Sequence, residues 1–269
     1  MLMALQGPYM LTVERDDDLI SPRRDGDNFG TMVCFHRRHN LGDSHTYEDK
    51  DEFLRDLFIR SVGGGEQAEE RYDRLVNSIS EQDGTPYGSY AYARAVDEAL
   101  LKEIRLNYVV LPLYLYDHSG LTMNTTGFHD PWDSGQVGWI YVSKEDILQE
   151  YDAALFTDEL RLKAEDLLRG EVNAYDAYLR GEGYGYELYK YEELEDSCWG
   201  FMGSLEDVCK DIAEYLPDEC KGMTEQLIEV DHPESMIKTL LKHARIQVEQ
   251  AAKAFEHTPR QQVVGADAR

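Results

Sequence analysis

Apolar residues along this chain follow two spacings. A spacing of three and four residues, which places side chains on one face of a helix, predicts helices over 48–61, 66–80, 89–107, 143–151, 158–181, 205–216 and 233–257. Short runs rich in aromatic and β-branched residues predict strands over 8–14, 29–36, 108–116 and 137–142, and a hairpin over 184–203. Helices interspersed with strands that are not adjacent in sequence indicate an α+β fold, with a mixed or antiparallel sheet and several amphipathic helices.

Capping and strand-breaking residues refine these boundaries. Ser143, Thr157 and Ser204 stand where N-caps are expected, because a side-chain hydroxyl there accepts a hydrogen bond from the first helical turn. Pro112 lies inside a predicted strand and lacks the N–H that a β-ladder requires. We therefore expect this strand to lie at the edge of its sheet or to carry a bulge.

The chain is strongly acidic, and the acidity is uneven. Its 269 residues include 53 Asp and Glu against 27 Lys and Arg, for a net charge of −26. Residues 142–235 hold 26 of these acidic side chains and only 8 basic ones. We divide the chain into an α+β domain over 1–142, which carries a polar loop, and an acidic, mainly helical region with a hairpin over 143–269, packed together as one unit.

Such a surface disfavours nucleic acid and anionic membranes as partners, because phosphate-rich surfaces are bound through Lys and Arg. It favours a protein with a basic surface, and carboxylates along a helix can imitate a row of phosphates. The competing explanation is a solvated helix face that serves solubility or a high-salt habitat. The candidate partner-binding residues are Glu192, Glu193, Glu195, Asp196, Glu206 and Asp207.

Metal-ligating side chains are dense in one short segment. Imidazole and thiolate are good ligands for zinc and iron. However, His36 and His39 would face opposite sides of an extended strand, and Arg37 and Arg38 between them repel a cation. We expect no bound metal, and a polar loop or substrate-facing edge instead. The segment contains Cys34, His36, His39, Asp43 and His45.

Residues 117–136 form a polar loop between the predicted strands 108–116 and 137–142, which we expect to be neighbours. Asp, His and Ser are the groups of nucleophilic catalysis, but here they are consecutive, and adjacent side chains of an extended chain diverge. A site therefore needs groups from elsewhere, and we expect the loop to pack on segment 29–45. The alternative is that the polar groups bond the loop's own backbone. If the protein is an enzyme, the candidate catalytic residues are Asp117, His118, Asp133, Ser134 and His36.

Several familiar sites are missing from the sequence. Gly63–Gly65 lacks the Lys-Ser/Thr of a P-loop, and no GxGxxG follows a predicted strand. The four cysteines form no CxxC pair, as expected for reduced thiols in a cytosolic protein. The N-terminal residues lack the pattern of a signal peptide, and no apolar stretch approaches the roughly 20 residues that span a bilayer. We expect no cofactor.

Two stretches are similar to an uncharacterised family of accessory proteins carried by bacteriophages, prophages and plasmids. The first is DNFGTMVCFH (27–36) with NLGD (40–43), and the second is YDHSG (116–120) with WDSGQVG (132–138). A weaker third piece comprises YDAYL (175–179), Gly181, YGY (184–186) and DSCWGF (196–201). The resemblance covers about two thirds of the chain and implies an accessory protein inside a bacterial cell. It carries over no functional residue.

These observations favour a phage or mobile-element protein that acts by binding in the bacterial cytoplasm. The leading hypothesis is counter-defence, in which the acidic surface occupies the basic nucleic-acid-binding cleft of a host nuclease or restriction complex. The alternative is a hydrolase or nucleotide-modifying enzyme that uses loop 117–136 with segment 34–45. A pocket in which His36 or His45 meets Asp117 and Asp133 would favour the enzyme, and a convex acidic ridge would favour the binder.

Overall fold

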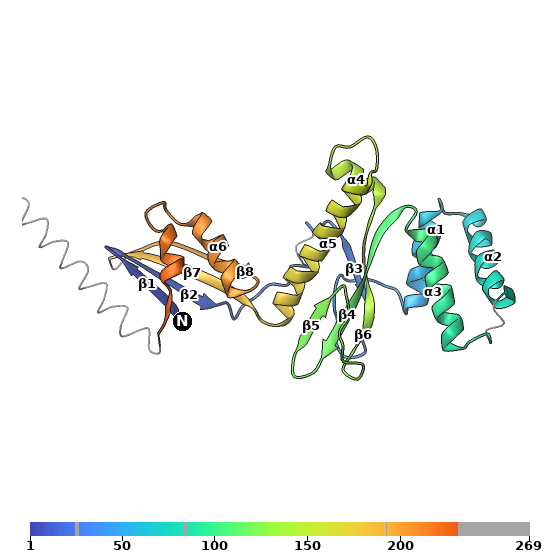
Figure 1. Cartoon of the computed structure of the whole chain (residues 1–269), viewed down its shortest axis with the longest axis horizontal. Coiled ribbons are helices and arrows are strands. Elements are labelled where there is room, and N and C mark those ends of the chain that lie inside the picture. The colour runs from blue at the N-terminus through green and yellow to red at the C-terminus, as the bar shows by residue number, and fades with distance from the viewer. Residues whose placement is uncertain (25–26, 83–85, 192, 231–269) are drawn as a thin grey trace, which may run out of the picture. The chain divides into compact units, whose positions relative to one another are not determined.

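The computed structural model describes residues 1–24, 27–82, 86–191 and 193–230. They form two compact units, each built around its own antiparallel sheet (Figure 1). One unit comprises residues 20–180, and the other joins residues 1–19 to the described residues that follow residue 180. The α+β fold class expected from the sequence is confirmed.

The sheet of the 20–180 unit has the order β3-β6-β4-β5, with every neighbouring pair antiparallel. The long pairing of β4 with β6 confirms that the two apolar runs on either side of the polar loop are neighbouring strands. A third short strand lies inside the segment expected to be a loop throughout. The strands are β3 (Thr31–Cys34), β4 (Tyr108–Asp117), β5 (Leu121–Asn124) and β6 (Ser134–Ser143).

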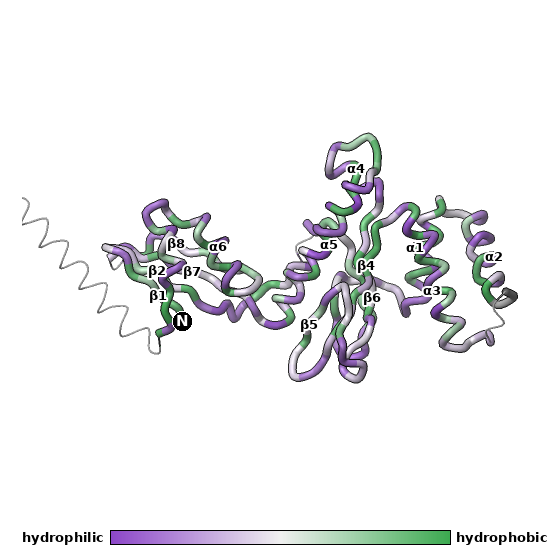
Figure 2. Tube along the Cα trace, in the orientation of Figure 1, coloured by the Kyte–Doolittle hydropathy of each residue, from purple (hydrophilic) through white to green (hydrophobic). Residues whose placement is uncertain are grey.

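Helices cover both faces of this sheet, because alternate strand residues point to opposite sides. Met32 and Ile140 belong to one core with side chains of α4 and α5. Val33 and Trp139 belong to a second core with side chains of α1 and α3, against which α2 packs. The hydrophobic centres of β4 and β6 between these layers are visible in Figure 2. The helices are α1 (Lys50–Ser61), α2 (Glu66–Gln82), α3 (Tyr90–Ile104), α4 (Lys144–Glu150) and α5 (Asp158–Leu179).

Pro112 stands in a strand that lies inside the sheet, between β6 and β5. The pairing with β6 shifts register between Leu113 and Tyr114, directly after the proline. The ladder with β5 begins only at Tyr114, so Pro112 itself lies on a part of β4 that is paired with β6 alone. Both expected features are therefore observed, a locally unpaired edge at the proline and a bulge directly after it.

The three expected N-caps are confirmed. The hydroxyls of Ser143, Thr157 and Ser204 each accept a hydrogen bond from the backbone N–H three residues further on, at 3.0, 3.2 and 3.3 Å. Gly181, after the end of α5, has φ +65°, a left-handed conformation that glycine adopts without a Cβ clash.

The second unit contains a sheet of order β8-β7-β2-β1-β9. Leu11 and Tyr186 of this sheet form a core with Val208 and Ile212 of helix α6 (Leu205–Tyr215) and with Met223 of the 3₁₀ helix η1 (Lys221–Gln226). The expected hairpin is present as β7 and β8. The strands are β1 (Leu2–Gln6), β2 (Tyr9–Arg15), β7 (Gly183–Lys190), β8 (Glu193–Met202) and β9 (Ile228–Glu229).

The compact units divide the chain elsewhere than at the expected boundary between 142 and 143. That boundary falls at the junction of β6 and α4, which pack in the same core. The first strands of the chain instead pair with β7, far along the sequence. The expected boundary was placed from local sequence patterns, and these patterns do not show which distant segments pair as strands.

None of the helices that the structure describes is both long and apolar enough to cross a membrane. The helix expected over 233–257 and the candidate residue Glu192 lie outside the described residues.

Candidate functional site

The loop that follows β3 carries most of the imidazole and guanidinium groups of the site. β3 ends at Cys34, and Gly42 then forms an isolated bridge back to the strand. Gly42 has φ +71°, and a Cβ at this position would lie 2.6 Å from the Met32 carbonyl oxygen, so the return requires glycine. Residues 36–39 lie between these two fixed points.

A buried arginine holds the part of this loop that comes back to β3. The Arg23 side chain is 2% exposed, and its Nε and Nη2 donate to the two carboxylate oxygens of Asp43 at 2.8 and 2.7 Å. Its Nη1 donates to Glu171 of α5 at 2.8 Å. Asp43 also accepts a hydrogen bond from the Met32 N–H at 2.7 Å. The carboxylate of Asp43, a candidate metal ligand in the sequence, is therefore occupied in holding the fold.

Cys34 and His45 also contribute to the fold. Burial of the Cys34 thiol raises its pKa to about 12, so the sulfur stays protonated and is a poor nucleophile or metal ligand at neutral pH. His45 Nε2 lies 2.9 Å from the Cys34 carbonyl oxygen, and its ring packs on Phe35. Two members of the candidate segment remain, His36 and His39.

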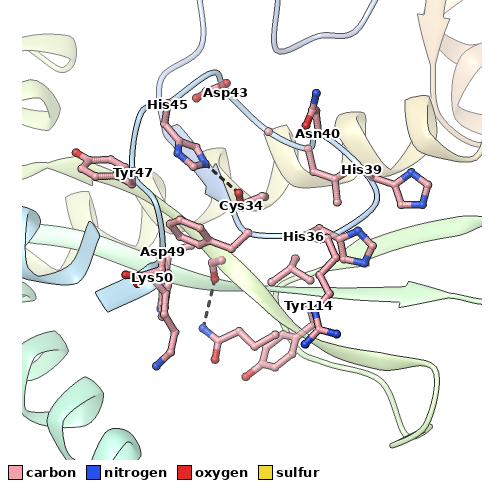
Figure 3. A pocket seen from close by; sticks show the side chains of 18 of the residues that line it. Cys34, His36, His39, Asn40, Asp43, His45, Tyr47, Asp49, Lys50 and Tyr114 are labelled. Atoms are coloured by element: carbon pink, nitrogen blue, oxygen red, sulfur yellow. Dashed lines mark hydrogen bonds between the residues drawn. The ribbon is translucent and has the colours of Figure 1, made fainter. Parts of the chain in front are cut away.

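His36 and His39 lie side by side on the loop (Figure 3). Their rings stack with centroids 5.2 Å apart and planes at 13°. Each Nε2 faces the same oxygen of Asp117, at 3.7 Å for His36 and 3.9 Å for His39. The Arg38 guanidinium donates to this oxygen as well. The expectation that the two histidines face opposite sides is wrong, because the strand ends at Cys34 and the chain then bends.

These contacts confirm that the expected polar loop 117–136 meets the 29–45 segment, at its first residue, Asp117, which ends β4. The His36 side chain is 18% exposed. Burial, and then the neighbouring His39, lower the pKa of His36, while the Asp117 carboxylate opposes the shift. The imidazole of His36 is therefore favoured in its neutral form, which can accept a proton or bind a metal.

A cleft of about 1880 Å³ opens beside the two histidines (Figure 3). Its walls come from the loop after β3, the start of α1, α3, and parts of β4, β6 and α5. Tyr114 of β4 and Gln136 of β6 are among the residues that line it. The imidazole and cationic side chains that line it are Arg24, His36, Arg37, His39, His45, Lys50 and Arg94.

The charges around this cleft are only partly balanced by one another. Within the wall, Lys50 pairs with Asp97 at 2.6 Å, and Arg94 with Glu98 at 2.9 Å. Arg24 and Arg37 are exposed and form no ion pair with the residues that the structure describes. Two exposed carboxylates of the same lining, Glu48 and Asp49, also form no ion pair with the described residues, so cations and carboxylates without partners both face the cleft.

The rest of the polar loop is organised differently from the expected catalytic set. His118 Nδ1 lies 2.9 Å from Asp133 Oδ2 as a separate, largely exposed pair. The Ser134 hydroxyl donates to the Asp130 carbonyl oxygen, as in the backbone-bonding alternative. The structure thus brings His36 to Asp117 and His118 to Asp133, in two distinct places along the loop.

Sequence reasoning missed two contributors to the site. His39 was outside the expected catalytic set, and Arg38 was treated only as an obstacle to a cation. Both contact Asp117. Two histidines three residues apart were the available signal, and a correct end for the preceding strand would have placed them together.

The acidic candidates lie in the other unit. Glu193, Glu195 and Asp196 are exposed on β8, an edge strand, where charge also discourages pairing with other chains. Asp196 accepts a hydrogen bond from the Tyr186 hydroxyl at 2.6 Å. Glu206 and Asp207 stand in the first turn of α6, where negative charge favours the helix. These residues therefore do not form one continuous helix face.

Compared with known protein families, with curated proteins and with solved structures, the chain has no match.

Proposed function

We propose that the 20–180 unit is a hydrolase or nucleotide-modifying enzyme that acts on an anionic, phosphorylated substrate. The observation that carries this proposal is the placement of two imidazoles against one carboxylate, His36 and His39 with Asp117, beside a cleft. The two segments involved are those that the enzyme hypothesis required to meet. The geometry therefore favours the enzyme over the binder for this unit.

Two arginines of the cleft support the substrate class, and the lining carboxylates Glu48 and Asp49 oppose it. Arg24 and Arg37 lack ion-pair partners among the described residues, and a guanidinium binds phosphate oxygens through two parallel N–H donors. The cleft volume of about 1880 Å³ exceeds the roughly 300–1,000 Å³ of ordinary small-molecule sites. A nucleotide or a longer phosphorylated chain fits these dimensions better than a small apolar compound does.

The chemistry of the cluster supports hydrolysis. Imidazole transfers protons near neutral pH, and a neighbouring carboxylate orients the ring and stabilises its charged form. The Cys34 thiol is buried and protonated, and the Ser134 hydroxyl bonds the backbone, so neither is prepared to act as a nucleophile. We infer attack by water that the cluster of His36, His39 and Asp117 activates.

The test is turnover of chromogenic phosphomonoesters and phosphodiesters by the purified full chain. His39→Ala and Asp117→Asn should slow hydrolysis by roughly 10²–10⁴-fold, because each removes one member of the cluster. His118→Ala provides the matched control, since it removes a histidine from the other His–Asp pair of the same loop. Equal turnover in all four proteins would exclude this cluster as the reactive site.

A second proposal concerns the other unit and retains the binding hypothesis. Its described residues, 1–19 and 181–230 without 192, carry an excess of carboxylates, and Glu193 and Glu195 on β8 are exposed without an ion-pair partner in the described chain. These features support attraction to a basic protein surface. In a mobile-element protein of the bacterial cytoplasm, the partner would be a nucleic-acid-binding defence complex, and no nucleic acid would bind directly. Salt-sensitive association with such a complex is the measurement that tests it.

A further inference from the structure

The cluster of His36, His39 and Asp117 has the composition of a metal site. Each residue offers one ligand atom, and these atoms all lie within 4.8 Å of one another. Two imidazole nitrogens and one carboxylate oxygen form a common protein set for zinc and for other first-row divalent ions. Side-chain exposures of 18%, 39% and 21% leave a path by which an ion can enter.

The spacing of these atoms is close to that of a coordinated ion. Bonds of about 2.0–2.1 Å in tetrahedral geometry place neighbouring ligand atoms roughly 3.3–3.4 Å apart. The separations of 3.7 and 3.9 Å between the Nε2 atoms and Asp117 Oδ2 exceed this only slightly. The third separation, between the two imidazole nitrogens, is at most 4.8 Å, so the stacked rings must turn toward each other to close the set around an ion.

Arg38 is the main competitor for this position. Its guanidinium contacts the Asp117 oxygen that both imidazoles face, but the side chain is 69% exposed. The backbone N–H of Arg38 also donates to His36 Nδ1, in a long hydrogen bond of 3.4 Å. This hydrogen bond is lost when His36 Nε2 binds a metal, because the ring proton then moves to Nδ1. The guanidinium thus occupies the place of a cation against the carboxylate, and it can swing into solvent when an ion binds.

We propose that His36, His39 and Asp117 bind a divalent transition-metal ion of the zinc class. Three protein ligands leave at least one coordination position open, which is the arrangement of catalytic rather than structural zinc sites. His36 and His39 line the cleft, so the open position is accessible to water and substrate. The role of the ion in activating water rests on the proposed hydrolytic function and would take the place of proton transfer by the two Nε2 atoms, whereas its binding does not rest on that function.

The experiment measures binding of Zn²⁺ and Co²⁺ to the untagged full chain by calorimetry and by the visible absorption of bound Co²⁺. One ion per chain is expected. His39→Ala and Asp117→Asn should weaken binding by more than about 100-fold, since even outer-shell partners of metal ligands contribute roughly 10–100-fold. His118→Ala should bind as the wild type does, because its histidine belongs to the exposed pair with Asp133. Arg38→Met should bind more tightly, because a competing positive charge is removed.

The proposal is overturned if the wild type shows no saturable binding of one ion, or if His39→Ala and the His118→Ala control bind equally. Weaker binding by Arg38→Met would also contradict it, because that result would make the guanidinium a support of the site. Circular dichroism of each variant checks that the fold is retained. The binding experiment contains no substrate, so failure to bind metal overturns the metal site and leaves the hydrolase proposal to be decided by the turnover assay. Metal binding without turnover would support the metal site and contradict the hydrolase proposal.

Discussion

Arg23 and Asp43 are joined by two hydrogen bonds, from Nε to Oδ1 at 2.8 Å and from Nη2 to Oδ2 at 2.7 Å. The same guanidinium reaches Glu171 on α5 and the Gly30 carbonyl oxygen. This one side chain therefore connects the start of the 20–180 unit, the loop after β3 and the helix behind the sheet. The position of His36 and His39 depends on how firmly that loop is held.

Loss of the Arg23 guanidinium should be costly. Arg23→Met leaves Asp43 and Glu171, whose side chains are 24% and 18% exposed, without their counter-charge. Breaking a buried ion pair on one side typically costs about 3–5 kcal/mol, so the free energy of unfolding in urea should fall by roughly this amount. Arg74→Met, which removes an exposed ion pair on α2, is the control and should leave the unfolding midpoint unchanged. Equal stability of the two variants would show that the network is not a major support.

Two glycines of β6 provide a matched test of the sheet that carries the site. A Cβ at Gly138 would lie 1.9 Å from the Val33 carbonyl oxygen, whereas a Cβ at Gly135 would meet open space. Gly138→Ala must therefore separate β3 from β6 and should reduce the free energy of unfolding by about 1–3 kcal/mol or more. Gly135→Ala should have little effect. If both variants melt at the wild-type temperature, the close approach of the strands is wrong.

Much of the fold was predictable because its signals are local. The N-caps at Ser143, Thr157 and Ser204 and the bulge after Pro112 follow from side-chain chemistry at single positions. The division into units was not predictable in this way. It depends on the pairing of β2 with β7, which joins residues 9–15 to residues 184–190.

The candidate site was predictable in part. The meeting of Asp117 with the segment after β3 followed from two polar stretches that flank apolar strands. The contact of His36 with His39 was not predicted. The predicted strand extended to residue 36, and the alternation of side chains along a strand then placed the two rings on opposite faces. The part that Asp43 and Cys34 play in holding the fold was not predicted, since burial cannot be seen from residue type alone.

The state of Cys34 can be tested by its reactivity. Burial raises the pKa of this thiol from an ordinary value of 9.0 to about 12. Native protein should therefore react slowly with a soluble maleimide at Cys34 up to about pH 9, whereas the partly exposed Cys198 should react readily. Mass spectrometry of digests identifies the labelled position. Rapid labelling of Cys34 in folded protein would contradict its burial.

The same shift has a consequence for stability. A thiol pKa that is higher in the folded state stabilises the fold fully below about pH 9, and this contribution is lost as the pH rises from about 9 to 12. Wild-type protein should lose more unfolding free energy over this range than Cys34→Ala does. Parallel curves for the two proteins, measured by urea unfolding at each pH, would exclude the effect.

The acidic unit is tested by charge reversal. Glu193→Lys/Glu195→Lys should weaken binding to a basic host nuclease or restriction complex and reduce its dependence on salt. Asp196 is left intact because it accepts a hydrogen bond from Tyr186. Glu70→Lys/Asp73→Lys, an equal change of charge on α2, is the control. If both double variants bind alike across a salt series, the β8 carboxylates do not form the binding surface.

Hydrolysis of a phosphorylated substrate by the cluster of His36, His39 and Asp117 can be measured as release of p-nitrophenol. The substrates are p-nitrophenyl phosphate and bis-p-nitrophenyl phosphate, and the full chain is assayed with and without added Zn²⁺ or Mn²⁺. We expect turnover of at least one of these esters, a loss of roughly 10²–10⁴-fold in His39→Ala and Asp117→Asn, and wild-type rates in His118→Ala. Turnover of neither ester under any of these conditions, or equal rates in Asp117→Asn and the wild type, would contradict it.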